Sequence, residues 1–383
     1  MHSQRGRRHV PNKVGLDIGS HTIKGVEVIE RGAETVIRSV GSTVIANEKF
    51  GNQTPSPSAT IRAIRGLWSS ASFGTNRVVL AMPAHSVYTK WLHIEAADEE
   101  ELEHTAISMA TRGAPFPAVD AIVDYRIISA KDIGSRTRYS VMLASVSSSA
   151  LDALLDMAEN AGLEPIAVDI APAAAVRSFD TQQRTAGPLW IDQPHAHCIV
   201  GARNTTIAVV RGDALEFSRT VPVGGNDFTG PVMDDMQTSW ERADNVKMNP
   251  GTRLGPNGVM TALGLDGEAH IPCESVIARL AREIQRSLRF FSSQFAGGSY
   301  LGMLGATTLS GGGALLKGLD ACLGEHGVEI TGIVNPFSGF SVVAEAGGIQ
   351  RATESTAAYT TAVGLAIGDY WSETKESRFN LAA

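Results

Sequence analysis

Apolar and polar residues alternate on both sides of a short turn near the start of the chain. The alternation runs through the segment KVGLDIGSHTIKGVEVI, which begins at Lys13 and turns at Gly19 and Ser20. A period of two residues is typical of a β-strand with one buried face. Two such runs around a glycine-containing turn predict a β-hairpin with Asp17 at the mouth of the turn.

Helical and strand patterns then alternate up to about residue 172. A helix is expected over 58–70, after Pro55 and Pro57, and a buried strand over 78–83. The following segment predicts strands over 86–94, 121–129, 139–146 and 166–170, with helices over 98–112 and 149–161. The order strand, helix, strand, strand, helix, strand predicts a compact α/β unit of its own.

The second half of the sequence, from about Gly187, begins with the same order of elements as the first half. A strand ending in Asp192, a tight turn and a returning strand from Cys198 match the strand that ends in Asp17 and its hairpin. The remaining expected elements are strands over 205–211, 216–223 and 306–310, a helix after Gly224, helices over 275–295, 315–325 and 355–369, and an irregular excursion over 249–271. This weak internal similarity suggests a two-fold nucleotide clamp.

Composition narrows the class of protein. The 383 residues predict two domains or one large composite, and 43% hydrophobic residues are enough for a real core. The net charge of -7 argues against a nucleic-acid coat, so no nucleic-acid partner is expected. The cysteines form no CxxC pair, which argues against a disulfide scaffold or a structural zinc site. Glycines interrupt the uncharged run 290–316, so a membrane-spanning helix is not expected there.

The first turn is a candidate phosphate site, because glycine-rich turns supply backbone N–H groups that approach a phosphate closely. Gly19 permits the approach, Ser20 and Thr22 can donate hydrogen bonds, and Asp17 can hold a magnesium ion through water. A structural hairpin that happens to use Asp and Gly is the alternative.

Two other segments carry candidate binding residues. Gly311, Gly312, Gly313 and Ala314 lie where a strand becomes a helix, so adenine or phosphate can lie against their backbone; a packing turn is the alternative. Asp244 and Lys247 are three residues apart on an expected helix and can reach one ribose, unless they form a solvated ion pair. Four arginines at helical spacing are interpreted as a solvated face: Arg279, Arg282, Arg286 and Arg289.

Taken together, these segments resemble the actin-like ATPase superfamily, and more narrowly the PilM family of type IV pilus assembly proteins, which is related to the FtsA division proteins. The similarity covers about residues 13 to 370. It is carried by these segments in order: VGLDIGSHTIKGVEV, VVLAMPAHSV, EEELEHTAISMATRGAPFP, IVDYRII, RTVPVGGNDFT, ADNVK, LSGGGALLKGLDACL, NPF and AYTTAVGLAIG.

The resemblance implies an actin-like (ribonuclease H-like) α/β fold, duplicated, with two lobes around a nucleotide cleft and a small inserted α/β subdomain. The implied parts are a disordered basic tail (1–12), the first actin-like subdomain (13–83), the inserted subdomain (84–170), a return to the first lobe (171–186), the second-lobe core (187–225 and 300–354), the second-lobe small subdomain (226–299) and a closing helix on the first lobe (355–371).

The resemblance also implies a site for ATP with Mg²⁺. Asp17, Gly19, Ser20, Thr22 and Lys24 would lie near the phosphates, Asp192 at the second phosphate strand, Asp244 and Lys247 near the ribose, and Gly311 to Ala314 at the adenosine. Asp17 and Asp192 would hold the magnesium ion through water.

Two departures from the family pattern predict weak or absent hydrolysis. The second turn is expected at Asp192-Gln193-Pro194-His195, where Pro194 cannot donate and its neighbours would crowd a γ-phosphate. Ala171 stands where an acidic residue is expected in many relatives. Hydrolysis needs a positioned water and charge stabilisation.

The implied partner is the cytoplasmic tail of a PilN-like membrane protein, held in a groove between the first and inserted subdomains. The chain would lie in the cytoplasm at the inner face of the inner membrane, attached indirectly, and self-association stays open. A type IV pilus and a type II secretion platform both fit. A small-molecule kinase and an FtsA-like division protein are the alternatives, although no terminal amphipathic helix is evident over 372–383.

Overall fold

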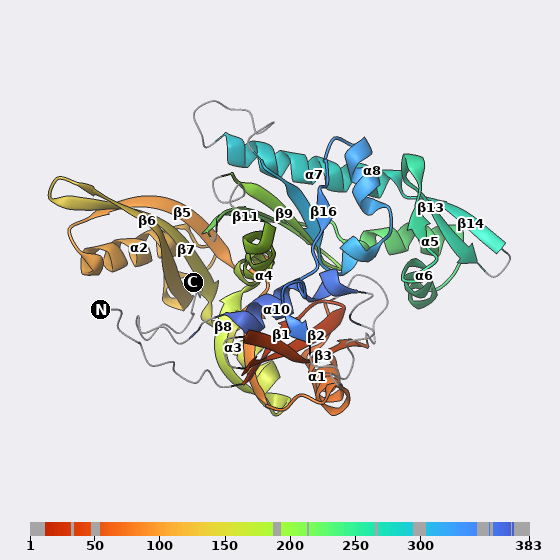
Figure 1. Cartoon of the computed structure of the whole chain (residues 1–383), viewed down its shortest axis with the longest axis horizontal. Coiled ribbons are helices and arrows are strands. Elements are labelled where there is room, and N and C mark those ends of the chain that lie inside the picture. Colours follow the sequence, from red (N-terminus) through yellow and green to blue (C-terminus); the bar gives the residue numbers. More distant parts are fainter. Residues whose placement is uncertain are drawn as a thin grey trace.

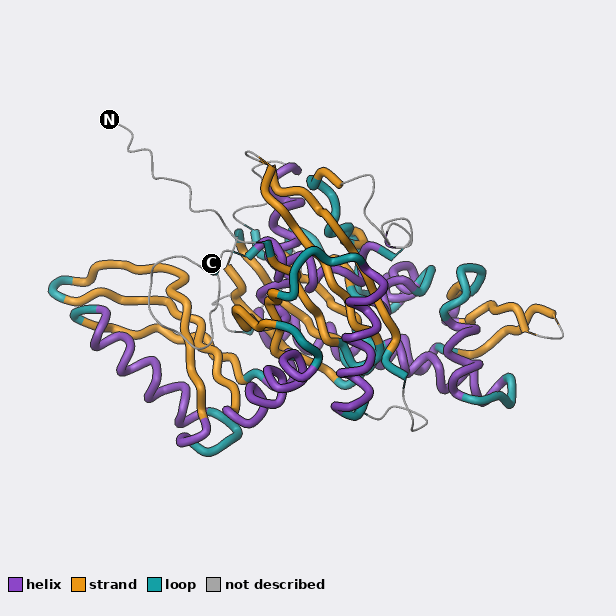
Figure 2. Tube along the Cα trace, turned by 90° about the horizontal axis from the view of Figure 1, so that it is seen from below, coloured by secondary structure: helices purple, strands orange, loops and turns teal. Residues whose placement is uncertain are grey.

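The chain forms two lobes, each built on one large β-sheet, with a smaller sheet at each end of the molecule (Figure 1). The computed structural model describes residues 12–31, 34–46, 54–186, 193–212, 214–264, 267–293, 304–342, 352, 355–368 and 370. Figure 2 shows the two smaller sheets projecting on opposite sides of the central strands and helices. The duplicated actin-like α/β fold is confirmed.

The first lobe contains a six-stranded sheet. Its strands, in spatial order, are β17 (Ser341–Val342), β3 (Glu34–Val44), β2 (Thr22–Arg31), β1 (Lys13–Ile18), β4 (Arg77–Met82) and β8 (Glu164–Ile170). The strands β1, β2 and β3 are antiparallel, while β4 and β8 continue parallel to β1. The hairpin expected around Gly19 is therefore present, as β1 and β2.

The second lobe repeats this pattern of pairing. Its strands, in spatial order, are β11 (Ala214–Val221), β10 (Thr205–Arg211), β9 (His195–Val200), β15 (Thr307–Ser310) and β16 (Gly332–Ile333). The first three are antiparallel and the last two continue parallel to β9. The strand β9 is thus the counterpart of β1, and β10 is the counterpart of β2.

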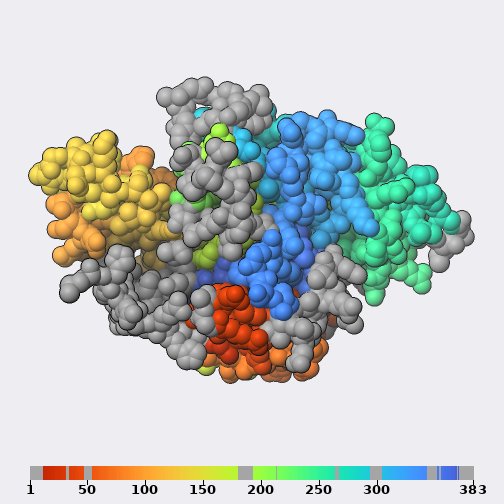
Figure 3. All heavy atoms as spheres, in the orientation of Figure 1, coloured from red at the N-terminus to blue at the C-terminus, as the bar shows by residue number. Residues whose placement is uncertain are grey.

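Helices cover both sheets and join the lobes. Helix α1 (Pro57–Ala71) follows the third strand of the first lobe, and α7 (Glu274–Ser292) comes between β11 and β15 in the second. Helix α4 (Ala171–Ala186) crosses α10 (Thr360–Ile367) so closely that a Cβ at Gly364 would lie 1.6 Å from the Ala174 carbonyl oxygen. Figure 3 shows part of the blue C-terminal region against the red strands of the first lobe. In this region β17 pairs with β3.

The inserted sheet is smaller than the sequence suggested. It contains β5 (Tyr88–Ala96), β7 (Arg136–Ser147) and β6 (Ala121–Ile133) in spatial order, and α2 (Glu99–Gly113) covers one face. The expectation that 84–170 forms one unit is wrong in its last part. Strand β8 pairs with β4, and α3 (Ser148–Asn160) packs on α1, because their apolar faces complete the core of the first lobe.

Two expectations about the second lobe are corrected. The segment 249–271 is not irregular, because β12 (Arg253–Leu254), β13 (Val259–Gly264) and β14 (Gly267–Pro272) form a sheet, beside α5 (Thr229–Asp235) and α6 (Trp240–Lys247). Its Gly, Pro and Asn residues lie largely in the turns between these strands. The helix expected from residue 315 begins later, as α8 (Leu319–Glu325), because Gly318 has a φ of +84°.

Candidate functional site

The first-lobe turn joins β1 and β2 at the centre of the molecule. Gly19 donates its N–H to the Thr22 carbonyl oxygen at 3.2 Å, and a Cβ at Gly19 would lie 2.7 Å from that oxygen. Only glycine therefore fits this turn without strain. Asp17 pairs with Lys24 across the hairpin, and Lys24 Nζ lies 4.0 Å from Asp17 Oδ2.

Burial opposes the charges of this pair. It raises the pKa of Asp17 and lowers the pKa of Lys24, while their mutual attraction works against both shifts. Ser20 and Thr22 are half-buried beside the pair. A charged acid and a charged amine at one turn suit a magnesium–phosphate group, which carries both signs of charge.

The second-lobe turn joins β9 and β10 in the same way. Gly201 donates its N–H to the Asn204 carbonyl oxygen at 2.9 Å, and a Cβ at Gly201 would lie 2.9 Å from that oxygen. This geometry repeats that of Gly19 and Thr22. Two residues before each turn glycine stand Asp17 and Ile199, so the acid of the first turn has an apolar counterpart in the second.

The expected second turn at Asp192-Gln193-Pro194-His195 is therefore in the wrong place. Asp192 lies outside the described residues. Pro194 directly precedes β9, at the end opposite the turn, and its carbonyl oxygen accepts from the Gly305 N–H at 2.9 Å. The bulky side chains that were expected to crowd a γ-phosphate do not form this turn.

The glycines expected at the adenosine pack against the second-lobe turn. Gly311, with a φ of +84°, donates to the Ala357 carbonyl oxygen, and a Cβ there would lie 2.4 Å from the Val200 carbonyl oxygen. Gly225 donates to the Gly201 carbonyl oxygen at 2.9 Å. A Cβ at Gly225 would lie 3.7 Å from the Cα of Gly313. The loops that contain Gly201, Gly225 and Gly311 thus meet at one place. Gly312 and Ala314 belong to the last of these loops.

Asp244 and Lys247 are not a solvated ion pair. Asp244 is 9% exposed, and Lys247 Nζ donates to its Oδ1 at 2.6 Å, to Thr229 Oγ1 at 2.8 Å and to the Gly225 carbonyl oxygen at 3.2 Å. Both side chains therefore belong to the same loop cluster as Gly225. We expect a buried pair in this position to fix the loop and to present polar groups to a ligand.

Two contacts join the lobes across this region. His21 Nε2 of the first turn lies 3.5 Å from Asp244 Oδ2, and Arg203 of the second turn donates to Thr54 Oγ1 at 2.6 Å. Burial lowers the pKa of His21, while Asp244 acts in the opposite direction. Sequence reasoning did not select His21, Arg203 or Gly201. The signal that identifies the second turn is a glycine between two strand-like runs, with Cys198 to Val200 before Gly201 and Thr205 to Val210 after it.

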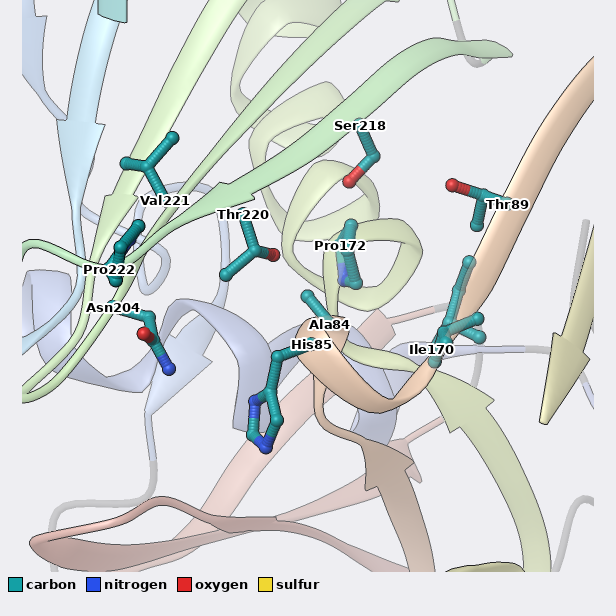
Figure 4. A pocket seen from close by; sticks show the side chains of 11 residues that line it. Ala84, His85, Thr89, Ile170, Pro172, Asn204, Ser218, Thr220, Val221 and Pro222 are labelled. Carbon is teal, nitrogen blue, oxygen red and sulfur yellow. The ribbon is translucent and has the colours of Figure 1, made fainter. Parts of the chain in front are cut away.

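A pocket of about 380 Å³ lies between the lobes and the inserted sheet (Figure 4). Its walls come from the turn after β4, the start of β5, the junction of β8 and α4, the turn before β10, and the end of β11. Its polar lining consists of His85, Thr89, Asn204, Ser218 and Thr220. Burial and, to a smaller extent, the charge of Arg203 lower the pKa of His85. The pocket therefore offers neutral hydrogen-bonding groups among apolar walls.

His197 lies on β9, four residues before the second-turn glycine, and its fully buried ring contacts β15. Its Nδ1 lies 2.8 Å from Thr308 Oγ1 and its Nε2 lies 2.9 Å from Ser310 Oγ, while Phe179 stacks on the ring. Burial lowers the pKa of His197 to about 4. The neutral imidazole thus holds the strand that leads into Gly311.

His197 predicts a pH dependence of stability. Because its folded pKa is below the unfolded value, the stabilisation is complete above pH 6.5 and is lost as the pH falls toward 4. Between pH 7.5 and pH 5.0 the loss is about 2 kcal/mol in the free energy of unfolding. Urea titrations at both pH values measure it. The His197→Gln variant, which cannot ionise, should lose correspondingly less, and an equal loss would contradict the assignment.

The described residues also limit membrane crossing and metal binding. Among the described residues, no helix combines the length and the apolar character needed to cross a bilayer. Within the same residues, no three His, Cys, Asp or Glu side chains are grouped as metal ligands. Asp17 alone fits an outer carboxylate for Mg²⁺, since nucleotide phosphates and water supply most ligands of that ion.

Comparisons with known proteins support the fold. The sequence model of the family described as type IV pilus assembly protein PilM matches residues 15–370. The solved PilM–PilN type IV pilus biogenesis complex aligns with a TM-score of 0.76 and 23% identity, covering 94% of this chain and 98% of that one. The ethanolamine utilization protein EutJ from Carboxydothermus hydrogenoformans aligns with a TM-score of 0.51 and 14% identity, covering 94% of this chain and 90% of that one.

One relative matches this chain over only about half of its sequence. The cell division protein FtsA of Bacillus subtilis is 24% identical over 216 residues, which are 52% of this chain and 48% of the relative. The chain thus spans about half the length of that protein.

Proposed function

Since the chain belongs to the type IV pilus assembly protein PilM family, we propose that it is a scaffold with two ligands. It binds Mg·ATP between its lobes with little or no hydrolysis, and it holds the tail of a PilN-like membrane protein. One observation carries the nucleotide half of this proposal. The glycine loops around Gly201, Gly225 and Gly313 meet beside the Asp244–Lys247 pair, and His21 reaches that pair from the first lobe.

In this proposal each residue keeps the role that the family resemblance implies. The turn from Gly19 to Thr22 offers backbone N–H and hydroxyl donors to phosphate oxygens, and Lys24 offers a positive charge. Asp17 orients water on Mg²⁺, which supplies charge neutralisation when it is bound. Asp244 and Lys247 lie on the ribose side, and the open backbone at Gly312 lies on the adenosine side.

We attribute weak hydrolysis to Ile199 in the second turn. The sequence had suggested the segment Asp192 to His195 instead. An acid at Ile199 would stand where Asp17 stands in the first lobe, and it would orient water or the metal from the opposite side. Isoleucine can do neither. The backbone of the turn can still bind phosphate. However, the turn has no acidic side chain at this position to orient an attacking water.

The partner half of the proposal rests on the pocket at Thr89. This pocket lies where the inserted sheet leaves the first lobe, and β11 of the second lobe forms a further wall. We propose it as the groove for the tail. Its volume is at the lower end of small-ligand sites and accommodates one or two large side chains. Neutral hydroxyl and amide groups suit the backbone of an extended peptide.

Filling the pocket should block the tail. We expect Thr89→Trp to weaken binding of the cytoplasmic tail peptide of the PilN-like protein from the same organism by at least about tenfold, because the indole occupies the space of a tail side chain. Fluorescence anisotropy of a labelled peptide measures the affinity. Thr111→Trp, on helix α2 outside the pocket, is the matched control. Equal affinities of the two variants would place the tail elsewhere.

In this proposal the chain works at the cytoplasmic face of the inner membrane, in the platform of a type IV pilus, and the bound tail supplies its attachment. The absence of an acid at Ile199 also favours a scaffold over the small-molecule kinase. That alternative needs a catalytic acid facing the γ-phosphate.

A further inference from the structure

The outer face of helix α7 carries a row of arginines, here called the arginine stripe: Arg279, Arg282, Arg286 and Arg289. All four side chains are exposed, while the opposite face of α7 packs into the core of the second lobe. With a rise of about 1.5 Å per residue, the stripe is about 15 Å long. Helix α7 runs along the edge of the second lobe that is farthest from β1 and β2 (Figure 1). The first residue of the stripe, Arg279, pairs with Asp227 in the loop of Gly225, and the other three lie farther along α7.

Most of the stripe has no electrostatic partner within the described part of the chain. Arg279 pairs with Asp227, but no described carboxylate lies within ion-pairing distance of Arg282, Arg286 or Arg289. This is unusual for a chain whose net charge is -7. The sequence pattern alone suggested a merely solvated face. Three unpaired guanidinium groups in a row are instead arranged to receive anions, and each can bind phosphate through two N–H groups.

A large apolar side chain lies beside the stripe. Phe290 is 54% exposed, although its ring centroid lies only 6.0 Å from that of Phe217 in the core. On a helix, Phe290 lies about 20° from Arg279 and borders the side of the stripe. Basic side chains near a membrane are attracted to anionic headgroups, and an exposed aromatic ring beside them can enter the interface between headgroups and acyl chains.

We propose that the arginine stripe and Phe290 dock α7 on the anionic headgroup layer of a phospholipid bilayer. The guanidinium groups bind lipid phosphates, and Phe290 enters the boundary between headgroups and acyl chains. Charges more than about 10 Å from the bilayer are screened, so the acidic remainder of the chain does not prevent the contact. An acidic protein or a nucleic acid would use the arginines but leave Phe290 without a role.

The contact is expected to be weak and to orient a chain that the partner tail already holds near the membrane. Each basic residue near an anionic surface raises the partition coefficient about fivefold, so three give about a hundredfold. The inference stands apart from the proposed tail binding, because vesicles without any partner protein test it.

Vesicle sedimentation gives the first test. The full chain is mixed with vesicles of phosphatidylcholine containing phosphatidylglycerol, and with vesicles of phosphatidylcholine alone, at low and high salt. The triple variant Arg282→Gln, Arg286→Gln, Arg289→Gln should lose about a hundredfold in partition into the anionic vesicles at low salt. The control variant Arg62→Gln, Arg112→Gln, Arg253→Gln removes the same charge from exposed positions on α1, α2 and β12 and should bind like the unmodified chain.

Both variants keep the basic residues that precede Lys13. If both bind the vesicles equally, the lipid contact lies outside the arginine stripe and the proposal is wrong.

A second measurement separates lipid from other polyanions. The native cysteines are buried, so a Phe290→Cys variant can be labelled with an environment-sensitive dye. Anionic vesicles should shift the dye emission to the blue, whereas polyglutamate and RNA should not. Binding of polyglutamate or RNA as tight as that of vesicles, with no spectral shift on vesicles, would assign the stripe to an acidic macromolecule instead.

Discussion

The Asp17→Asn variant is expected to bind Mg·ATP between about ten and a hundred times more weakly than the unmodified chain, because Asp17 orients the water shell of the metal. Binding of ATP in EDTA should stay equal or become tighter. Without the metal, the Asp17 carboxylate repels the phosphates, and its removal frees Lys24, 4.0 Å away, to attract them. Isothermal titration calorimetry with and without Mg²⁺ measures both affinities.

A matched substitution separates this effect from a general change in charge. Asp152→Asn removes the same charge from an exposed position on α3 and should leave both affinities unchanged. Should Asp17→Asn weaken ATP equally in Mg²⁺ and in EDTA, the carboxylate does not act through the metal, and its role would be to hold the turn.

The Ile199→Asp variant is expected to hydrolyse ATP at least about tenfold faster than the unmodified chain. It places a carboxylate two residues before Gly201, as Asp17 stands before Gly19, where it can orient a water molecule. A positioned general base contributes about a hundredfold or more when its geometry is good. Phosphate release under single-turnover conditions measures the rate directly.

The variant Ile199→Asn is the control for shape and polarity without a negative charge. It should bind ATP while hydrolysing it no faster than the unmodified chain. If Ile199→Asp binds ATP but its rate equals that of Ile199→Asn, the missing acid is not what limits hydrolysis.

Much of the fold follows from periodicity. The hairpin around Gly19 and the amphipathic helix α7 show clear periods of two and of 3.6 residues, so both could be predicted. The sheet over β12 to β14 could not, because its strands are short and the turn residues between them dominate the pattern. The sequence also did not predict that α3 and β8 pack in the first lobe, because hydrophobic periodicity does not show which elements pack together.

The residues of the candidate site could be predicted where they belong to a recognisable local motif. Asp17, Gly19, Lys24, Asp244, Lys247 and the Gly311–Ala314 loop are all brought to the centre of the molecule. The sequence prediction misplaced the second turn because the family pattern has an acid there, whereas this chain has Ile199 at that position and its acid at Asp192. The true position of the second turn shares with the first turn a glycine that stands between two antiparallel strands. Contacts between the lobes, such as that of His21 with Asp244, have no local sequence signal.

The most direct test of the proposed function is calorimetric titration of the full chain with ATP and Mg²⁺, followed by an assay of phosphate release from the same sample. We expect one Mg·ATP bound per chain and little or no phosphate released. Absence of binding at millimolar ATP would contradict it. So would rapid multiple turnover, since Ile199 would then not impair hydrolysis.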